Sequence, residues 1–228
     1  MNTQNLRIAM LAFPGMQPLD FFGPYDLFDA AGVEAVVVAG KAGPVQVDRL
    51  LSMTAEYSFE DAPETDVLFV PGGHGVTDCL EDEACMRYLR SANHGWITSV
   101  CTGALLLAAA GLLRGYRATT HWRYIDLLEL GGAIPVRDER IVTDRNRVTG
   151  GGVTAGIDFG VALLATIAGE ETARLAQLAL EYEPAPPFGG HPSTADAATV
   201  ERYRERTEAR LQKRKAEMEQ AIARAPQP

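Results

Sequence analysis

One cysteine, Cys101, lies where a strand-like apolar segment gives way to a helix-forming one. The segment of residues 96–100 is short and rich in β-branched side chains, whereas the segment of residues 104–113 is rich in strong helix formers. A thiol at a helix N-terminus faces unpaired backbone N–H groups and the positive end of the helix dipole, and both favour the thiolate. Because the thiolate is the nucleophile, this position predicts a reactive cysteine. The alternative is a buried structural cysteine, which packs as a small hydrophobic residue.

Small residues flank this cysteine at the spacing of a nucleophile elbow. Ser99 and Gly103 lie two positions before and two positions after Cys101. In hydrolases, small residues at these positions let the backbone turn sharply from a strand into a helix and expose the nucleophile. The first of them is a serine here, so the segment is a variation on that pattern. We predict a nucleophile elbow at Cys101.

Length, composition and charge narrow the class of protein. The chain has 228 residues, 46% of them hydrophobic and 22% charged, as expected of one large soluble α/β domain. The net charge of −9 argues against a nucleic-acid-binding surface, which needs a cationic patch. The apolar runs are shorter than the ~20 residues of a membrane span, and no signal-peptide pattern precedes the first predicted strand. Three cysteines at these spacings suit neither a disulfide framework nor a metal site, so we predict a cytoplasmic protein without a bound metal.

Strand-like and helix-like segments alternate along the chain. Repeated alternation of this kind predicts an α/β fold with a mainly parallel sheet sandwiched by helices. Strands are expected at residues 6–13, 33–39, 66–70, 96–100 and 117–120, a hairpin or loose strand pair at 45–59, a hairpin at 140–149, and helices at 18–31, 80–93, 104–113, 124–130, 153–168, 170–182 and 196–225.

The pattern predicts one domain and a terminal extension. Residues 5–190 are expected to form the α/β domain. Residues 191–228 are expected to form a charged helical extension that packs on the same domain or on a dimer partner. Apolar positions in this extension are scattered, and a mostly polar helix usually lies across a surface or a subunit boundary.

Three predicted strands deliver their following loops to one place. The strands at residues 6–13, 66–70 and 96–100 should end at the same edge of a parallel sheet, where ligands bind in such folds. This brings the loops at 14–20 and 71–75 beside the elbow. We expect the active site there.

Two glycines in the second loop are candidates for binding substrate through the backbone. Gly72 and Gly73 can bring N–H groups close to a substrate and, with the N–H of Thr102, stabilise developing charge. The neighbouring His74 is expected to line the pocket through its backbone. The alternative for this segment is an ordinary tight turn.

Several motifs together resemble the PfpI/ThiJ-type cysteine superfamily, whose fold is flavodoxin-like or class I glutamine amidotransferase-like. The resemblance covers most of the chain, and within the superfamily it is strongest to the isonitrile (isocyanide) hydratase branch. The motifs are Pro-Gly-Gly at 71–73, Val-Cys-Thr-Gly at 100–103, Thr-Thr-His-Trp at 119–122 and Thr-Gly-Gly-Gly-Val-Thr-Ala-Gly at 149–156.

The resemblance implies a role for individual residues. It places the nucleophile on Cys101, the acid/base carboxylate on Asp20 and a supporting hydroxyl on Thr102. Many superfamily members have Glu at the carboxylate position, so the Asp favours the hydratase branch. His121 and Gly150 are expected behind the reacting groups. For His121 the notable alternatives are a direct catalytic role and a structural hydrogen bond. The resemblance also implies a homodimer that acts on a small-molecule isocyanide without a cofactor.

The implied chemistry needs one thiolate and one carboxylic acid. An isocyanide carbon accepts a thiolate and becomes basic as it does so, so Cys101 would attack while Asp20 protonates that carbon. Water would then release an N-substituted formamide from the resulting thioimidate. Asp20 must be protonated when substrate arrives, and desolvation beside a thiolate raises a carboxyl pKa.

Other members of the superfamily leave alternatives open. Regulators with an amidase-like domain share the Cys-Thr-Gly and Thr-Thr-His-Trp motifs, so a ligand- or redox-sensing module is one alternative, although the chain is too short for their additional DNA-binding region. Another cysteine-dependent hydrolase is a second alternative. The protease-like branch has His directly after its cysteine, where this chain has Thr102. The amidotransferases use a late His-x-Glu, where this chain has His191 followed by Pro and Ser193. Cys79 and Cys85 are expected only to pack.

Overall fold

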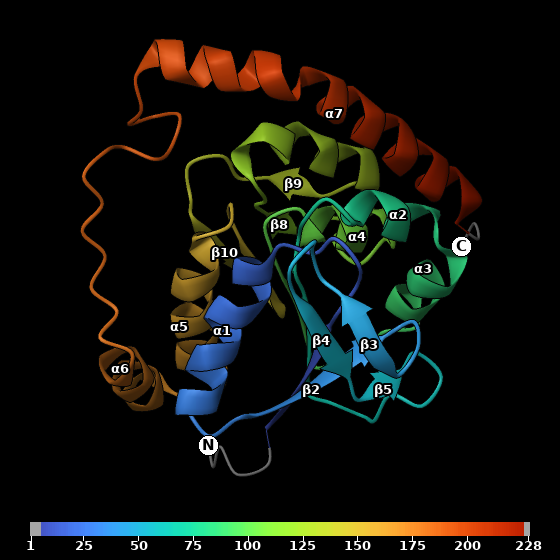
Figure 1. Cartoon of the computed structure of the whole chain (residues 1–228), viewed down its shortest axis with the longest axis vertical. Helices are drawn as coiled ribbons and strands as arrows, with labels where there is room; N and C mark the ends of the chain where they lie inside the picture. Colours follow the sequence, from blue (N-terminus) through green and yellow to red (C-terminus); the bar gives the residue numbers. More distant parts are fainter. Residues whose placement is uncertain (1–5, 226–228) are drawn as a thin grey trace.

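A computed structural model describes residues 6–225 of the chain (Figure 1). Residue 5, at which the predicted α/β domain begins, and residues 226–228, with which the predicted extension ends, lie outside the described residues. The prediction that no signal peptide precedes the first strand also concerns residues outside this range.

A seven-stranded sheet forms the centre of the described part of the chain. Its strand order is β10-β11-β7-β6-β1-β2-β5, and every neighbouring pair is parallel except β10 with β11. The central strands are buried nearly throughout, as expected for a parallel sheet covered on both faces. The strands are β1 (Arg7–Leu11), β2 (Glu34–Ala39), β5 (Tyr57–Ser58), β6 (Val67–Val70), β7 (Trp96–Val100), β10 (Ile141–Asp144) and β11 (Arg147–Gly150).

Helices cover both faces of this sheet, which confirms the predicted fold class. On one face, α1 (Pro18–Ala30), α5 (Ala155–Ile167) and α6 (Glu170–Ala179) pack against one another. On the other face lie α2 (Val76–Glu81), α3 (Glu83–Arg90), α4 (Gly103–Ala109) and the 3₁₀ helix η2 (Trp122–Gly131).

Small elements lie outside the central sheet. An antiparallel ribbon joins β3 (Gly43–Gln46) to β4 (Ser52–Ala55), and a short parallel pair joins β8 (Arg117–Ala118) to β9 (Ile134–Pro135). These two pairs account for the predicted strands at 45–59 and 117–120.

The prediction of one helix over residues 80–93 is wrong. The structure has α2 and α3 instead, separated at Asp82. The backbone of Asp82 is extended, and its carboxylate caps α3 by accepting a hydrogen bond from the N–H of Ala84 at 2.8 Å. A capping side chain can end one helix and start another without changing the spacing of the apolar residues. The apolar periodicity alone therefore did not reveal the break.

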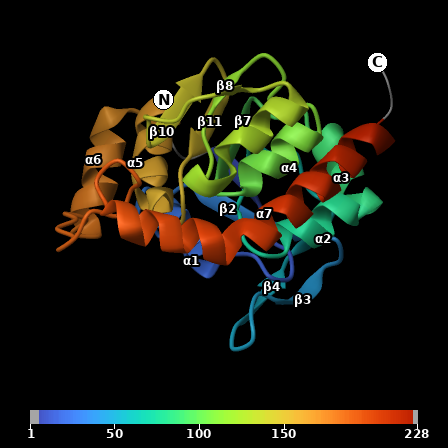
Figure 2. The ribbon, with the colours of Figure 1, turned by 90° about the horizontal axis from the view of Figure 1, so that it is seen from above.

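The long C-terminal helix α7 (Ala197–Arg224) crosses the molecule over η2, α2 and α4 (Figure 2). An irregular segment of residues 180–196 leads from α6 to this helix (Figure 1). The buried face of α7 consists of Thr207, Arg214, Glu217, Met218 and Ala221. No helix within residues 6–225 combines the length and apolar character needed to span a bilayer.

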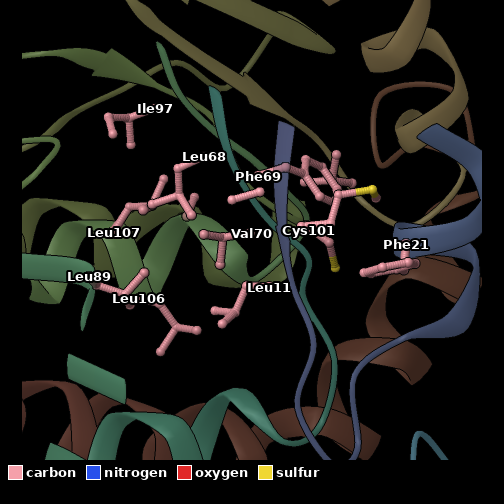
Figure 3. Close-up of a cluster of buried hydrophobic side chains, with 14 of the residues drawn as sticks. Leu11, Phe21, Leu68, Phe69, Val70, Leu89, Ile97, Cys101, Leu106 and Leu107 are labelled. Atoms are coloured by element: carbon pink, nitrogen blue, oxygen red, sulfur yellow. The ribbon is translucent and has the colours of Figure 1, made fainter. Parts of the chain in front are cut away.

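The hydrophobic core extends to the edge of the sheet at which the site lies. Cys101 belongs to the same buried cluster as Leu11, Val70 and Phe21 (Figure 3). The core therefore surrounds the cysteine and keeps water away from it.

Candidate active site

The backbone at Cys101 is strained as a nucleophile elbow requires. Cys101 lies between β7 and α4 with φ +54°, a conformation that costs energy for a residue other than glycine. Its N–H is held by the carbonyls of Gly150 at 3.1 Å and Gly151 at 2.8 Å, and its carbonyl accepts a hydrogen bond from Thr120 Oγ1 at 2.5 Å. These bonds hold the turn from both sides.

Gly103 allows the helix after the elbow to approach the sheet. A Cβ atom at this position would lie 2.2 Å from the carbonyl oxygen of Val70 and 2.7 Å from that of Pro71. No side chain fits in that space. The small residue that the sequence pattern required after Cys101 is therefore explained by contact with the end of β6.

Asp20 enters the site from the first turn of α1 and is completely buried. Its Oδ2 atom accepts a hydrogen bond from the N–H of Gly72 at 2.9 Å. Oδ1 is buried and has no hydrogen-bond partner in the described part of the chain. Burial raises the pKa of Asp20 to about 7, although the hydrogen bond from Gly72 and, after it, the interaction with the Cys101 thiol oppose the rise. The carboxyl therefore holds a proton up to neutral pH.

The prediction that the helix N-terminus favours the Cys101 thiolate is wrong in its net direction. Burial, and then the nearby Asp20 carboxylate, raise the pKa of the Cys101 thiol to about 12. The N–H groups of Val153 and Thr102 lower the thiol pKa by a smaller amount. The resting pair therefore keeps its proton on sulfur in preference to the carboxylate. A thiolate must form within the site.

The two loop glycines hold the reacting side chains. The N–H of Gly72 is bonded to Asp20, and the N–H of Gly73 donates to Thr102 Oγ1 at 3.0 Å. Both N–H groups that we expected to stabilise developing charge are thus bonded to protein side chains in this structure, and their part in binding substrate stays a prediction. The loop fixes the carboxylate and the hydroxyl relative to one another. Thr102 itself is buried.

Adding a methyl group at Gly72 is expected to disrupt the site. The new Cβ would lie 2.5 Å from Thr102 N, 2.7 Å from Thr102 Oγ1 and 2.8 Å from Asp20 Oδ2. We expect Gly72→Ala to lower turnover by at least about tenfold, since displacement of a positioned acid costs of this order or more. Steady-state kinetics on the folded variant measure its turnover. Gly40→Ala is the matched control, because its Cβ would meet only Phe59 Cε2 at 3.7 Å. Wild-type turnover in Gly72→Ala would contradict the assignment.

His121 lies behind the elbow as a neutral imidazole. Its Nδ1 accepts the N–H of Arg123 at 3.2 Å, so the ring hydrogen is on Nε2. Burial, followed by the charge of Arg214, lowers the pKa of His121 to about 4. Gly152 packs directly on this ring, where a Cβ would lie 2.7 Å from Cδ2. The structural hydrogen bond that was the alternative for His121 is therefore present.

The remaining candidates lie at the rim or away from the site. The side chain of His74 is exposed, and its pKa is lowered by partial burial and by Arg210 and Arg214. Cys79 and Cys85 are free, buried cysteines on α2 and α3, consistent with packing. Within residues 6–225 no group of three or more His, Cys, Asp or Glu side chains is placed to hold a metal.

Sequence reasoning missed two residues of the site. Thr120 bonds the Cys101 carbonyl, and the only available signal was its place beside His121 in the Thr-Thr-His-Trp motif. Arg214 reaches the Gly73 carbonyl from α7 with its Nη2 at 3.0 Å. Its signal was a spacing of three or four residues among the positions of α7 that face inward, including Thr207 and Met218.

A strained cysteine at a strand-to-helix turn, beside a buried carboxyl at one edge of a parallel sheet, defines a class of cysteine-centred α/β proteins. A profile of the DJ-1/PfpI family matches residues 6–166, and the chain belongs to this family.

Two individual relatives cover more of the chain than the family profile does. An isonitrile hydratase of Pseudomonas putida is 49% identical over 96% of this chain and 97% of its own. A ThiJ/PfpI family protein from Pseudomonas syringae, known from its crystal structure, has 40% identity and a TM-score of 0.90 over 94% of this chain and 90% of its own. The HTH-type transcriptional regulator CdhR of Pseudomonas aeruginosa is 33% identical over 60% of this chain but only 41% of its own.

Proposed function

We propose that the protein is an isonitrile hydratase, an enzyme that adds water to an isocyanide to give an N-substituted formamide. Its similarity to the Pseudomonas putida hydratase extends over nearly all of both chains, which supports a hydratase activity. The observation that carries the mechanism is a completely buried Asp20 carboxyl, with a pKa of about 7, that interacts with the thiol of the strained Cys101 elbow. The pair supplies a nucleophile and an acid at one point.

The first step joins the substrate to sulfur. The thiol proton passes from Cys101 Sγ to the Asp20 carboxylate, and the thiolate attacks the isocyanide carbon. Asp20 then gives this proton to the same carbon as it becomes basic, which leaves a thioimidate on Cys101 and a carboxylate on Asp20.

The second step adds water and releases the product. The Asp20 carboxylate takes a proton from water while the hydroxide oxygen bonds to the thioimidate carbon, and the nitrogen receives that proton. Collapse of the adduct breaks the carbon–sulfur bond, returns a proton to Asp20 and releases the formamide. The Cys101 thiolate and the Asp20 acid are restored. Thr102, held by Gly73 at 3.0 Å, is placed to keep the loop and the elbow in register during both steps.

The rate of hydration is expected to rise with pH through about 7. Asp20 with a pKa of about 7 and Cys101 with a pKa of about 12 share one proton between these values, whereas below about 7 both groups are protonated. A fully protonated pair has no base that can accept the thiol proton. A plot of kcat/KM against pH from 5 to 10 measures this, and a profile that falls with rising pH across 7 would contradict the assignment.

Formamide production by the purified protein tests the proposed function directly. A simple isocyanide is added, and the N-substituted formamide is followed by mass spectrometry together with the intact mass of the protein. Turnover to formamide is the expected result. Binding of the isocyanide without any product would instead indicate a sensing module, and turnover of amides or glyoxal adducts alone would indicate another cysteine-dependent hydrolase.

The proposal includes a setting for the enzyme. We propose a cytoplasmic homodimer that uses Cys101, Asp20 and Thr102 and takes a small-molecule isocyanide, with no nucleic acid or membrane as partner. The absence of a suitable membrane helix within residues 6–225 is consistent with this setting. Sedimentation of the purified protein measures the oligomeric state.

A further inference from the structure

Helix α7 contributes a cation to the active site. Arg214 projects from its inward face and is 98% buried, with a relative exposure of 2%. Its Nη2 donates to the carbonyl of Gly73 at 3.0 Å, and its guanidinium lies over the ring of Tyr124, 4.7 Å from the centroid. Nε is buried and has no hydrogen-bond partner among the described residues. An arginine is almost never buried to this extent unless its charge is paired.

The charge of Arg214 is not balanced by a close carboxylate. In the part of the chain that the structure describes, no Asp or Glu oxygen lies within 4.0 Å of this guanidinium, although Glu217 is near enough to raise its pKa. Glu217 is itself bonded to Lys213, 3.5 Å away. Buried charges are costly unless paired, so this cation needs a partner that appears at some stage of the reaction.

The groups around Arg214 identify that partner. Burial lowers the pKa of Arg214, while the charges of Tyr124 and Cys101 act in the opposite direction, so guanidinium and thiolate attract one another. When the thiol proton moves to Asp20, the negative charge moves from the carboxylate to sulfur. A fixed cation that is linked to the elbow through Gly73 and Thr102 favours this movement. The titratable and charged groups that face Arg214 are Cys101 of the elbow, His74 of the loop before α2, His121 and Tyr124 of η2, and Arg210 and Glu217 of α7.

Through its bond to the Gly73 carbonyl, Arg214 also contacts the loop that holds Thr102 and Asp20. Gly73 also donates its N–H to Thr102, and the adjacent Gly72 holds Asp20. The bond from Arg214 therefore fixes the loop on which both reacting partners depend. This contact comes from a helix that lies beyond residue 166, where the match to the DJ-1/PfpI family ends.

We propose that Arg214 is a positioning residue that holds the Gly72–Gly73 loop from α7 and stabilises the Cys101 thiolate formed when the thiol proton passes to Asp20. Its part in isocyanide hydration rests on the proposed function. The effect of Arg214 on the thiolate does not rest on the proposed function, because the thiolate forms in the free enzyme. The two can therefore be measured separately.

Alkylation of Cys101 by iodoacetamide reports the thiolate without any isocyanide. The rate is followed from pH 6 to 10 by mass spectrometry of the Cys101 peptide, which separates it from Cys79 and Cys85. Arg214→Met removes the charge at similar length and is expected to lower the rate at fixed pH by about tenfold. Arg214→Lys is expected to recover a large part of it. Arg206→Met, on the exposed face of α7, is the matched control and is expected to react as the wild type.

The result that overturns the proposal is an Arg214→Met variant that folds and alkylates with the rate and pH profile of the wild type. If that variant does not fold, Arg214→Gln keeps a donor for the Gly73 carbonyl without the charge, and it must show the same loss. A wild-type rate in Arg214→Gln would then overturn the thiolate role. If the wild-type protein makes no formamide but Arg214→Met still slows alkylation, the proposed function fails and the inference about Arg214 stands.

Discussion

Replacing Asp20 with asparagine is expected to lower kcat/KM for isocyanide hydration by about 10²–10⁴-fold, the range that a positioned general acid supplies. The amide keeps the shape of the carboxyl and can accept the Gly72 N–H through its oxygen, but it cannot receive the thiol proton or protonate carbon. The pH dependence through about 7 should disappear with it, because Asp20 is the group that titrates there. Kinetics across the same pH range measure both effects.

The same variant is expected to be more stable than the wild type at pH 8. The pKa of Asp20 is raised from 3.8 to about 7 in the folded protein, so its stabilising contribution is fully present below about pH 4 and is lost as pH rises through about 7. Asparagine has no charge to bury, so the gain is on the order of 4 kcal/mol at most. Asp26→Asn, at an exposed position of the same helix, is the control and should change neither turnover nor stability appreciably. Retention of turnover within tenfold in Asp20→Asn would contradict the acid role.

Replacing Cys101 with alanine is expected to abolish formamide formation. No other thiol among the described residues lies beside Asp20, since Cys79 and Cys85 lie on helices α2 and α3 outside the site. Cys101→Ser should also be inactive, because a buried hydroxyl is far less acidic than a thiol and Asp20 cannot deprotonate it. Product analysis with enzyme in excess of substrate gives the limit of detection. Cys85→Ala is the matched control and is expected to retain activity, whereas formamide formation by Cys101→Ala would show that the thiol is not the nucleophile.

The arrangement of the reacting residues could be predicted from sequence because topology fixes it. A parallel sheet delivers the ends of β1, β6 and β7 to one edge, and this alone brings the first turn of α1, which carries Asp20, beside Cys101. The elbow was visible because a sharp turn demands small residues at fixed spacing around the cysteine. Both inferences rest on backbone geometry.

What the sequence did not reveal depends on burial and on individual hydrogen bonds. The helix dipole acts on any residue at that position, but the net pKa of Cys101 depends on how completely the surrounding core excludes water. The N–H groups of Gly72 and Gly73 looked available until their partners on Asp20 and Thr102 were located. Arg214 is distant in sequence and comes from a helix whose charged composition indicated a surface or a subunit boundary. Its role follows from one contact with a loop carbonyl.

The covalent thioimidate on Cys101 is the central claim, and a single-turnover experiment tests it most directly. Enzyme in excess is mixed with an isocyanide, quenched at successive times and measured by intact and peptide mass spectrometry. The account predicts a transient species heavier by the whole mass of the isocyanide, located on the peptide containing Cys101, that decays as formamide appears. Formation of formamide at the full rate while Cys101 remains unmodified throughout would contradict it.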